Sequence, residues 1–256
     1  MGSKGIAIVT GAASGIGKAV ALRLAGDGFD VALNDLESSK ARLETLTQEI
    51  TQKGRRTTIV LGDVSKEADV KRMVDSTVQD LGSLDVMVAN AGVACKFVSF
   101  QDSTSEDWDR VFSINARGVF LCYKYAAQQM IKQGRGGRII GASSLAGKQG
   151  LSISASYCAS KFAVRGLTQS AAKDLGPHKI TVNAYAPGYI NTPLLTAMGE
   201  ELGGAEALRQ DRIKITPLGR LGEDEDIASI VSYLASKESH FITGQSISVN
   251  GGVYFD

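Results

Sequence analysis

The chain has 256 residues, of which 43% are hydrophobic and 21% are charged, and its formal net charge is +1. This composition is typical of a soluble globular protein, and the balanced charge excludes the basic bias that favours nucleic acid or an anionic membrane as a partner. No apolar run approaches the ~20 residues that span a bilayer, and the first residues do not follow a signal-peptide pattern. We therefore expect a cytoplasmic protein with no membrane and no nucleic-acid partner.

Apolar segments rich in β-branched residues recur along the chain and predict strands that are buried on both faces, as in a parallel sheet. In chain order they are GIAIVT, DVALND, TTIVLGD, LDVMVANAG, GRIIGASS, ITVNAYAPG and QSISVNGG. Helical patterns lie between them, near residues 15–27, 37–54, 66–81, 104–132, 155–175 and 224–236. The alternation predicts a single Rossmann-type α/β domain over residues 1–256, with a doubly wound parallel sheet of about seven strands and helices on both faces.

The segment 189–220 interrupts this alternation and contains Pro193, Gly203, Gly204 and Pro217. Insertions of this size in a compact α/β domain usually serve as lids or binding loops. We expect this segment to close over a substrate, and a mobile surface excursion is the alternative.

The first predicted strand leads into TGAASGIGKAV, a glycine-rich turn that opens a helix. Glycines at such a place allow a tight turn and let the backbone approach a pyrophosphate, while the helix N-terminus attracts its negative charge. The turn therefore predicts a dinucleotide site formed by Gly11, Ser14, Gly15, Ile16 and Gly17.

Asp35 ends the second predicted strand, about 20 residues beyond the glycines, where a carboxylate can accept hydrogen bonds from the adenosine ribose hydroxyls. A carboxylate ~4 Å from a 2′-phosphate would cost about 4 kcal/mol, and the neighbours Asn34 and Leu36 offer no cation to offset it. This predicts NAD(H) rather than NADP(H) as the cofactor. An aspartate at a strand end is also a common turn former, which is the alternative.

Small and polar residues also end the third and fourth predicted strands. They are Asp63, Val64, Asn90, Ala91 and Gly92. Because ligands of open α/β sheets bind outside the carboxyl ends of the strands, we expect these residues to complete the cofactor site, with Asp63 toward the adenine amino group.

Ser144 follows the fifth predicted strand, and Tyr157 and Lys161 lie one turn apart on the next helix. Carbonyl reduction needs a proton donor at the developing alkoxide, and tyrosine is the leading candidate because no metal ligands are indicated. The three cysteines lack metal-binding spacing, and the two histidines lie outside ligand patterns. An ammonium nearby lowers the pKa of a phenol, and Ser144 could hold the substrate oxygen. Alone, a Tyr-x-x-x-Lys pair is more often ordinary helix surface.

Taken together, these motifs resemble the short-chain dehydrogenase/reductase family in order and spacing, over essentially the whole chain. They are TGAASGIG at 10–17, NAG at 90–92, INARG around Asn115, Ser144, the Tyr157 and Lys161 pair, and PGYINTP at 187–193. The resemblance implies a catalytic tetrad of Asn115, Ser144, Tyr157 and Lys161. It also implies that Lys161 binds the nicotinamide ribose and that Asn115 holds a water that relays protons to Lys161.

The resemblance has three further implications. The nicotinamide end of the cofactor would contact Pro187, Gly188, Ile190 and Thr192, and the protein would form a homotetramer. The C-terminal half looks most like the acetoin reductase and 2,3-butanediol dehydrogenase branch, although Leu145 stands where bacterial members of that branch tend to have glutamine.

We therefore expect a small secondary alcohol or ketone as the substrate, such as acetoin, diacetyl or 2,3-butanediol. The predicted pocket is lined by Ser144, Leu145, Ile153, Tyr157, Tyr189, Leu194, Leu195 and Met198, and core packing is the alternative for the apolar ones. A sugar or polyol and a 3-oxoacyl thioester are alternative substrates. A nucleotide-sensing or scaffold protein without catalysis is the alternative from another class, because a fold alone does not determine function.

Overall fold

A computed structural model describes residues 2–255, and within this range seven parallel strands form one sheet in the order β3-β2-β1-β4-β5-β6-β7. The strands are β1 (Ile6–Thr10), β2 (Asp30–Asp35), β3 (Thr57–Leu61), β4 (Val86–Ala89), β5 (Gly137–Ala142), β6 (Ile180–Pro187) and β7 (Ser246–Val249). The predicted doubly wound sheet is confirmed. The end residues 1 and 256 of the predicted domain lie outside the described range.

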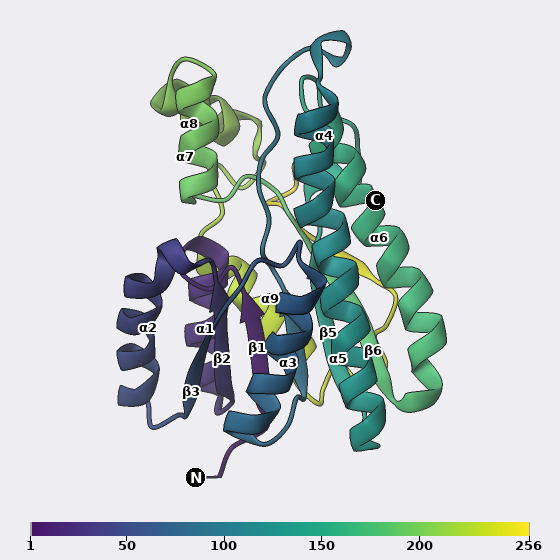
Figure 1. Cartoon of the computed structure of the whole chain (residues 1–256). Helices are drawn as coiled ribbons and strands as arrows, with labels where there is room; N and C mark the ends of the chain where they lie inside the picture. The colour runs from purple at the N-terminus through teal and green to yellow at the C-terminus, as the bar shows by residue number, and fades with distance from the viewer. Residues whose placement is uncertain (1, 256) are drawn as a thin grey trace.

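Helices cover both faces of the sheet (Figure 1). One face carries α1 (Gly15–Asp27), α2 (Lys40–Gln52) and α9 (Asp224–Ala235), and the other carries α3 (Glu67–Leu81), α5 (Val119–Gln133) and α6 (Ala155–Leu175). Three further helices lie toward the carboxyl edge of the sheet, namely α4 (Ser105–Phe112), α7 (Pro193–Glu201) and α8 (Ala205–Ile215). Within residues 2–255, no helix is both long enough and apolar enough to cross a membrane.

The unbroken apolarity of the strands follows from this double cover. Successive side chains of a strand point to opposite faces of the sheet, so Ile8 packs into the core beneath α3 and α5 while Val9 packs into the core beneath α1 and α9. Both side chains have no exposed surface. Apolar side chains at every position of a strand are therefore buried, and an alternating pattern would leave polar groups in one of the two cores.

Two predicted helices differ from the observed ones in their internal regularity. The helix expected near 104–132 is divided into α4 and α5 by a π-helical turn, Ser113–Gly118. At the end of this turn Gly118 packs against Val64, where a Cβ atom would lie 2.9 Å from Val64 Cγ2. The helix expected near 37–54 begins with a 3-10 turn, Glu37–Ser39, before α2. Neither irregularity has a signature in hydrophobic periodicity, which reports helical faces rather than single inserted residues.

The fit between α5 and β5 makes a prediction about stability. A Cβ atom on Gly141 of β5 would overlap the hydroxyl of Tyr123 of α5, which is hydrogen-bonded to Thr168 Oγ1 at 3.0 Å. Overpacking of a core typically costs about 1–3 kcal/mol, so Gly141→Ala should lower the free energy of unfolding by that amount, measured by urea denaturation. The control is Gly26→Ala, because Gly26 lies in α1 with no atom within 4 Å of the added methyl group. This second variant should gain about 0.5–1 kcal/mol, and equal effects of the two would contradict the packing argument.

Candidate active site

The glycine-rich turn between β1 and α1 adopts a conformation that side chains would obstruct. Gly11 and Gly15 have φ angles of 65° and 51°, in the left-handed region that favours glycine. A Cβ atom on Gly17 would overlap the carbonyl oxygen of Gly11. Ser14 precedes α1 without capping it through its side chain, so the first N–H groups of the helix keep hydrogen-bonding capacity for a ligand. These features fit the pyrophosphate of a dinucleotide.

Asp35 lies beside this turn, at the end of β2. Its Oδ2 accepts a hydrogen bond from the backbone N–H of Ala13 at 3.0 Å, and its Oδ1 accepts one from the N–H of Leu36 at 2.8 Å. The carboxylate thus anchors the turn, as the alternative interpretation held. It also lines the main cavity of the molecule, and a carboxylate that accepts two hydrogen bonds still has lone pairs for a further donor.

A hydrogen-bonded network joins the carboxyl ends of β1, β4 and β6. Asn90 Nδ2 donates to the carbonyl of Thr10 at 2.8 Å, and the Tyr185 hydroxyl donates to Asn90 Oδ1 at 2.8 Å. Thr10 Oγ1 accepts hydrogen bonds from the N–H groups of Asn90 and Ala91, both at 3.0 Å. The side chain of Asn90 therefore positions the strand ends around the cofactor site. Thr10 and Tyr185 are not among the site residues predicted from the sequence, although both stand near the ends of predicted strands.

One cavity of about 700 Å³ runs along this edge of the sheet and collects the predicted site. The predicted cofactor residues that line it are Gly11, Ser14, Gly15, Ile16, Gly17, Asp35, Asp63, Val64, Asn90, Ala91, Gly92, Tyr157, Lys161, Pro187, Gly188, Ile190 and Thr192. The predicted substrate residues Ser144, Leu145, Ile153, Tyr157 and Tyr189 line it as well. Residues from seven separate segments of the chain thus meet around one space.

Ser144, Tyr157 and Lys161 face the cavity at the junction of β5 and α6. The Ser144 hydroxyl accepts a hydrogen bond from the N–H of Ala146 at 3.1 Å, at the start of a 3-10 turn. Lys161 Nζ lies 5.5 Å from the centre of the Tyr157 ring and donates to the carbonyl of Ala142 at 2.9 Å. The carbonyl of Lys161 accepts a hydrogen bond from Ser143 Oγ, at 3.1 Å. The side-chain ammonium and the backbone carbonyl of Lys161 are therefore both held at the carboxyl end of β5.

The protonation states of the pair follow from burial. Burial raises the pKa of Tyr157 to about 12, against the lowering effect of a hydrogen bond with Ser144. Burial lowers the pKa of Lys161 to about 8. We expected the Lys161 ammonium to lower the pKa of Tyr157, but in this protein removal of the phenol from water is the larger effect. At neutral pH, Tyr157 therefore carries its proton and Lys161 is mostly charged.

Asn115 lies in the π-helical turn between α4 and α5 and does not line the cavity. It is fully buried, and its amide forms a two-way hydrogen bond with the backbone of Val93, with both distances 2.9 Å. Its Nδ2 also donates to Ser160 Oγ at 3.2 Å. A Cβ atom on Gly92 would lie 3.2 Å from Asn115 Oδ1 and 3.4 Å from Lys161 Nζ. Asn115 therefore holds the segment after β4 against α6, close to the ammonium of Lys161.

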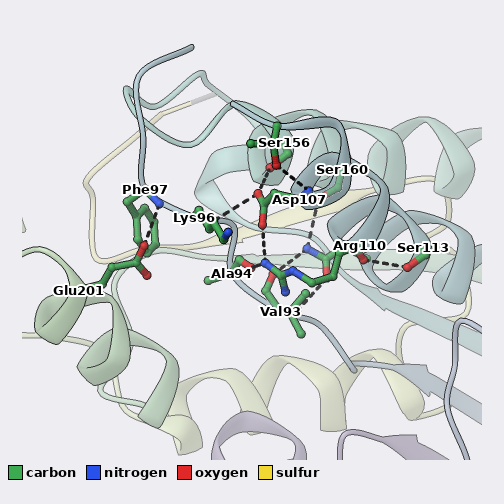
Figure 2. Close-up of polar contacts among 12 residues, drawn as sticks. Val93, Ala94, Lys96, Phe97, Asp107, Arg110, Ser113, Ser156, Ser160 and Glu201 are labelled. Carbon is green, nitrogen blue, oxygen red and sulfur yellow. Dashed lines mark hydrogen bonds and ion pairs between the residues drawn. The ribbon is translucent and has the colours of Figure 1, made fainter. Parts of the chain in front are cut away.

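The segment 93–97 forms one wall of the cavity and is fastened to α4 and α6 (Figure 2). The buried carboxylate of Asp107 accepts hydrogen bonds from the N–H of Lys96 at 3.2 Å and from the Ser156 hydroxyl at 3.1 Å. Arg110 pairs with Asp107 at 2.7 Å and donates to a backbone carbonyl of the segment at 2.8 Å. Asp107 thus connects the cavity wall directly to the residue that precedes Tyr157.

The segment 189–220 covers the cavity from the opposite side. Helix α7 begins after Thr192, whose Oγ1 accepts a hydrogen bond from the N–H of Leu195 at 3.4 Å. At the far end of α7, Glu201 Oε1 accepts a hydrogen bond from the N–H of Phe97 at 3.2 Å, which joins the two walls (Figure 2). A separate apolar cluster holds α7 against α8 and consists of Leu195, Leu208 and Leu221.

The substrate end of the cavity has a mainly apolar lining. Ile153 has a φ angle of 56°, which is uncommon for a β-branched residue. It lines the cavity and precedes Tyr157 by four residues in the chain. Leu145 is 2% exposed and contributes to both the core and the cavity wall. Arg212 of α8 also lines the cavity and is not among the site residues predicted from the sequence, because helical periodicity does not indicate which cation of a helix faces inward.

Comparison with known proteins assigns the family. The family described as enoyl-(acyl carrier protein) reductase matches residues 11–254. A short-chain dehydrogenase/reductase of Armillaria gallica is 52% identical over 252 residues, which cover 98% of this chain and 96% of the relative. The chain belongs to the short-chain dehydrogenase/reductase family. A short-chain dehydrogenase/reductase of Hericium erinaceus is 50% identical over 254 residues, covering 98% of each chain. The 3-oxoacyl-[acyl-carrier-protein] reductase FabG of Staphylococcus aureus is 42% identical over 97% of each chain.

Solved structures share the fold of this chain. Levodione reductase superposes with a TM-score of 0.94 at 31% identity, covering 98% of each chain. The acetoin dehydrogenase YohF of Salmonella typhimurium superposes with a TM-score of 0.86 at 36% identity, covering 99% of this chain and 97% of that structure. As a member of this family the protein is an oxidoreductase of alcohol and ketone groups, and its fold implies a nicotinamide cofactor.

The buried ammonium of Lys161 predicts a pH-dependent stability. Because its pKa is lowered from 10.5 to about 8, the unfolded chain holds a proton between these values that the folded protein has lost. Stability therefore rises with pH across this window. Relative to Lys161→Met, the wild-type free energy of unfolding should gain about 2 kcal/mol between pH 7 and pH 9.5. Urea midpoints at the two pH values measure this difference.

The pH range of the comparison stops below pH 10 because ionisation of Tyr157 changes stability in the opposite direction above that pH. Its raised pKa makes the unfolded chain lose a proton that the folded protein keeps, so stability falls with pH above 10. Lys214→Met is the control, because Lys214 is an exposed lysine of α8 that pairs with Asp211 at 3.6 Å. A difference in the free energy of unfolding between wild type and Lys161→Met that stays constant with pH would contradict the burial of the Lys161 ammonium.

Proposed function

We propose that this short-chain dehydrogenase/reductase is an NAD(H)-dependent carbonyl reductase, and in reverse a secondary alcohol dehydrogenase. The observation that carries the proposal is the meeting of Ser144, Tyr157 and Lys161 at the wall of the cavity that also receives the glycine-rich turn. A protein that only bound a nucleotide would have no need of a phenol and an ammonium aimed into the same space. The intact set therefore favours catalysis over a sensing or scaffold role.

The cofactor, when bound, supplies or accepts the hydride. The turn containing Gly11 and the uncapped N-terminus of α1 would hold its pyrophosphate. Asp35 would accept hydrogen bonds from the adenosine ribose hydroxyls, and its charge disfavours a 2′-phosphate. Among the described residues that line the cavity, the only cations are Lys161 and Arg212. In our assignment Lys161 lies at the nicotinamide end and Arg212 at the substrate end, so neither offsets the charge of Asp35, and this supports NAD(H).

Tyr157 would supply the proton in the reductive direction. With a pKa of about 12 its phenol is protonated at neutral pH, so it can donate to a ketone oxygen as negative charge develops there. The Ser144 hydroxyl, at the end of β5, would donate a second hydrogen bond to the same oxygen. The Lys161 ammonium would stabilise the phenolate left behind and bind the nicotinamide ribose. In the oxidative direction the same groups act in reverse.

Asn115 would act as a positioning residue for this chemistry. Its amide is engaged by Val93 and Ser160, so the side chain orders the wall next to Lys161. The proton relay through a water between Asn115 and Lys161 is part of the proposal.

The substrate that we propose is a ketone with a small apolar body, and acetoin and diacetyl are the first compounds to test. The apolar lining by Leu145, Ile153 and Met198 supports such a body, and the acetoin dehydrogenase of Salmonella typhimurium has the same fold at 36% identity. The segment 189–220 would be the lid that shields the reacting atoms from water.

A 3-oxoacyl thioester is the second candidate, because the Staphylococcus aureus FabG reductase is 42% identical. This substrate would favour NADPH and a basic residue at position 35, where the chain has Asp35. Turnover of acetoacetyl-CoA with NADPH, at a rate above that of diacetyl with NADH, would favour this candidate over the first.

Replacing Tyr157 by phenylalanine tests the mechanism. Loss of the proton donor should lower kcat for ketone reduction by about 10²–10⁴-fold, while the affinity for NADH, measured by quenching of protein fluorescence, should change little. Tyr125→Phe is the control, because the Tyr125 hydroxyl bonds Glu67 at 2.9 Å outside the cavity. Retention of wild-type kcat by Tyr157→Phe would exclude the proposed mechanism.

The charge of Asp35 tests the cofactor preference. The wild-type protein should use NADH with a kcat/KM about a hundredfold or more above that for NADPH, because the partly exposed carboxylate repels the 2′-phosphate. Asp35→Asn removes the charge and keeps most of the shape, so it should narrow this ratio at least tenfold. Glu37→Gln, at an exposed position two residues further on, should leave the ratio unchanged. A wild-type protein that is equally fast with NADPH would refute the assignment.

A further inference from the structure

The lid places one cation at the substrate end of the cavity. Arg212, on α8, lines the cavity, and its guanidinium carbon lies 4.8 Å from the centre of the Tyr189 ring. Tyr189 lines the same space and follows β6. The backbone beneath the side chain is also fixed, since Thr216 Oγ1 donates to the carbonyl of Arg212 at 2.7 Å. The guanidinium therefore lies against an aromatic ring at the cavity wall.

This cation has no acceptor within residues 2–255. Its Nε is buried and without a hydrogen-bond partner, and no ion pair joins the guanidinium to a carboxylate of the described chain. The other cations of α8 differ: Arg209 donates to Asn191 Oδ1 at 2.6 Å, and Lys214 pairs with Asp211 at 3.6 Å. Buried polar groups in native proteins are nearly always satisfied, so an exception at a cavity wall points to a missing partner.

The surroundings of Arg212 make the lack of a hydrogen-bond acceptor costly in free energy. Apolar side chains line the cavity near Tyr189, among them Leu195 and Met198, which pack in one cluster with it. In such surroundings an arginine without an acceptor loses hydration without compensation. The two carboxylates that line the cavity, Asp35 and Asp63, follow β2 and β3 at the nucleotide end. Neither carboxylate lies beside Arg212, so a bound substrate can supply the acceptor oxygen that the described residues do not.

We propose that Arg212 binds a second oxygen of the substrate, so that the preferred ketones carry a carboxylate or a further carbonyl group in addition to the carbonyl that is reduced. The inference rests on the proposed carbonyl reduction and specifies the substrate class of the same site. The planar fork of arginine suits a carboxylate through two hydrogen bonds and a carbonyl through one. The contact with the Tyr189 ring restricts the positions of the guanidinium before the substrate arrives.

The test compares ketones that differ only in the second oxygen. Wild type and Arg212→Met are assayed with 2-hexanone, 2,5-hexanedione and 5-oxohexanoate, and with 2-butanone, 2,3-butanedione and 3-oxobutanoate. In wild type, kcat/KM for at least one compound with a second oxygen should exceed that of the plain ketone of equal length about tenfold or more, as expected of a hydrogen bond to a charged group. Arg212→Met should reduce this ratio to near one.

Two further variants separate recognition from general electrostatics. Arg212→Lys keeps the charge and should retain part of the ratio for the keto acids, because a point charge still attracts a carboxylate. Lys214→Met removes a cation from the same helix and should leave all ratios unchanged. If Arg212→Met lowers the kcat/KM ratio only for the keto acids, the second group is a carboxylate. If it lowers the ratio only for the diketones, the second group is a neutral carbonyl.

A binding measurement makes the inference independent of turnover. In the presence of NAD⁺, which cannot reduce a ketone, calorimetric titration should show that hexanoate binds wild type at least tenfold more tightly than Arg212→Met if the second group is a carboxylate. 2-Hexanone, which has no second oxygen, should bind both proteins equally. Ratios of kcat/KM and affinities that are the same in wild type and Arg212→Met would overturn the inference. Failure of wild type to reduce any of the six ketones would instead contradict the proposed function, which is a separate result.

Discussion

The burial of the Lys161 ammonium is the most demanding feature of the molecule, and much of the site is arranged around it. Removing a cation from water costs free energy, and burial lowers its pKa to about 8. The carbonyl of Ala142 accepts one of its hydrogen bonds. Gly92 leaves room for Nζ that a Cβ atom would narrow, and Ser143 holds the backbone of the lysine from below. The buried charge therefore lowers the stability of the fold, and the proposed chemistry requires this charge.

The parallel sheet makes this arrangement possible. All strands point in the same direction, so their carboxyl ends bring side chains from remote parts of the chain to one edge. The strand order reverses between β1 and β4, and the network of Thr10, Asn90 and Tyr185 fastens the edge at that place. Asn90 Nδ2 also donates to the carbonyl of Gly11 at 3.4 Å, so the glycine-rich turn is bonded to the end of β4.

Much of the fold and of the cofactor end could be predicted from the sequence because each depends on local or periodic signals. Buried strands need unbroken apolar runs, and a tight turn at Gly11 needs glycine. The π-helical turn that carries Asn115 has no such signal, and the raised pKa of Tyr157 depends on how completely tertiary packing removes it from water. Asp35 serves both as a turn anchor and as a cavity group, so the two interpretations weighed for it are compatible. The homotetramer stays a prediction.

A contrast between the two ends of the cavity explains why high sequence identity to relatives does not identify the substrate. The cofactor end is built largely from backbone groups and glycines, whose positions are set by the sheet and shared by the fold. The part of the cavity near Tyr189 is built from side chains of the segment 189–220, among them Leu195 and Arg212. A single exchange at Arg212 would change the charge of this end without disturbing a strand or the turn at Gly11. Under the proposed function, substrate class can therefore change while the hydride chemistry stays the same, through exchanges among the side chains of the segment 189–220.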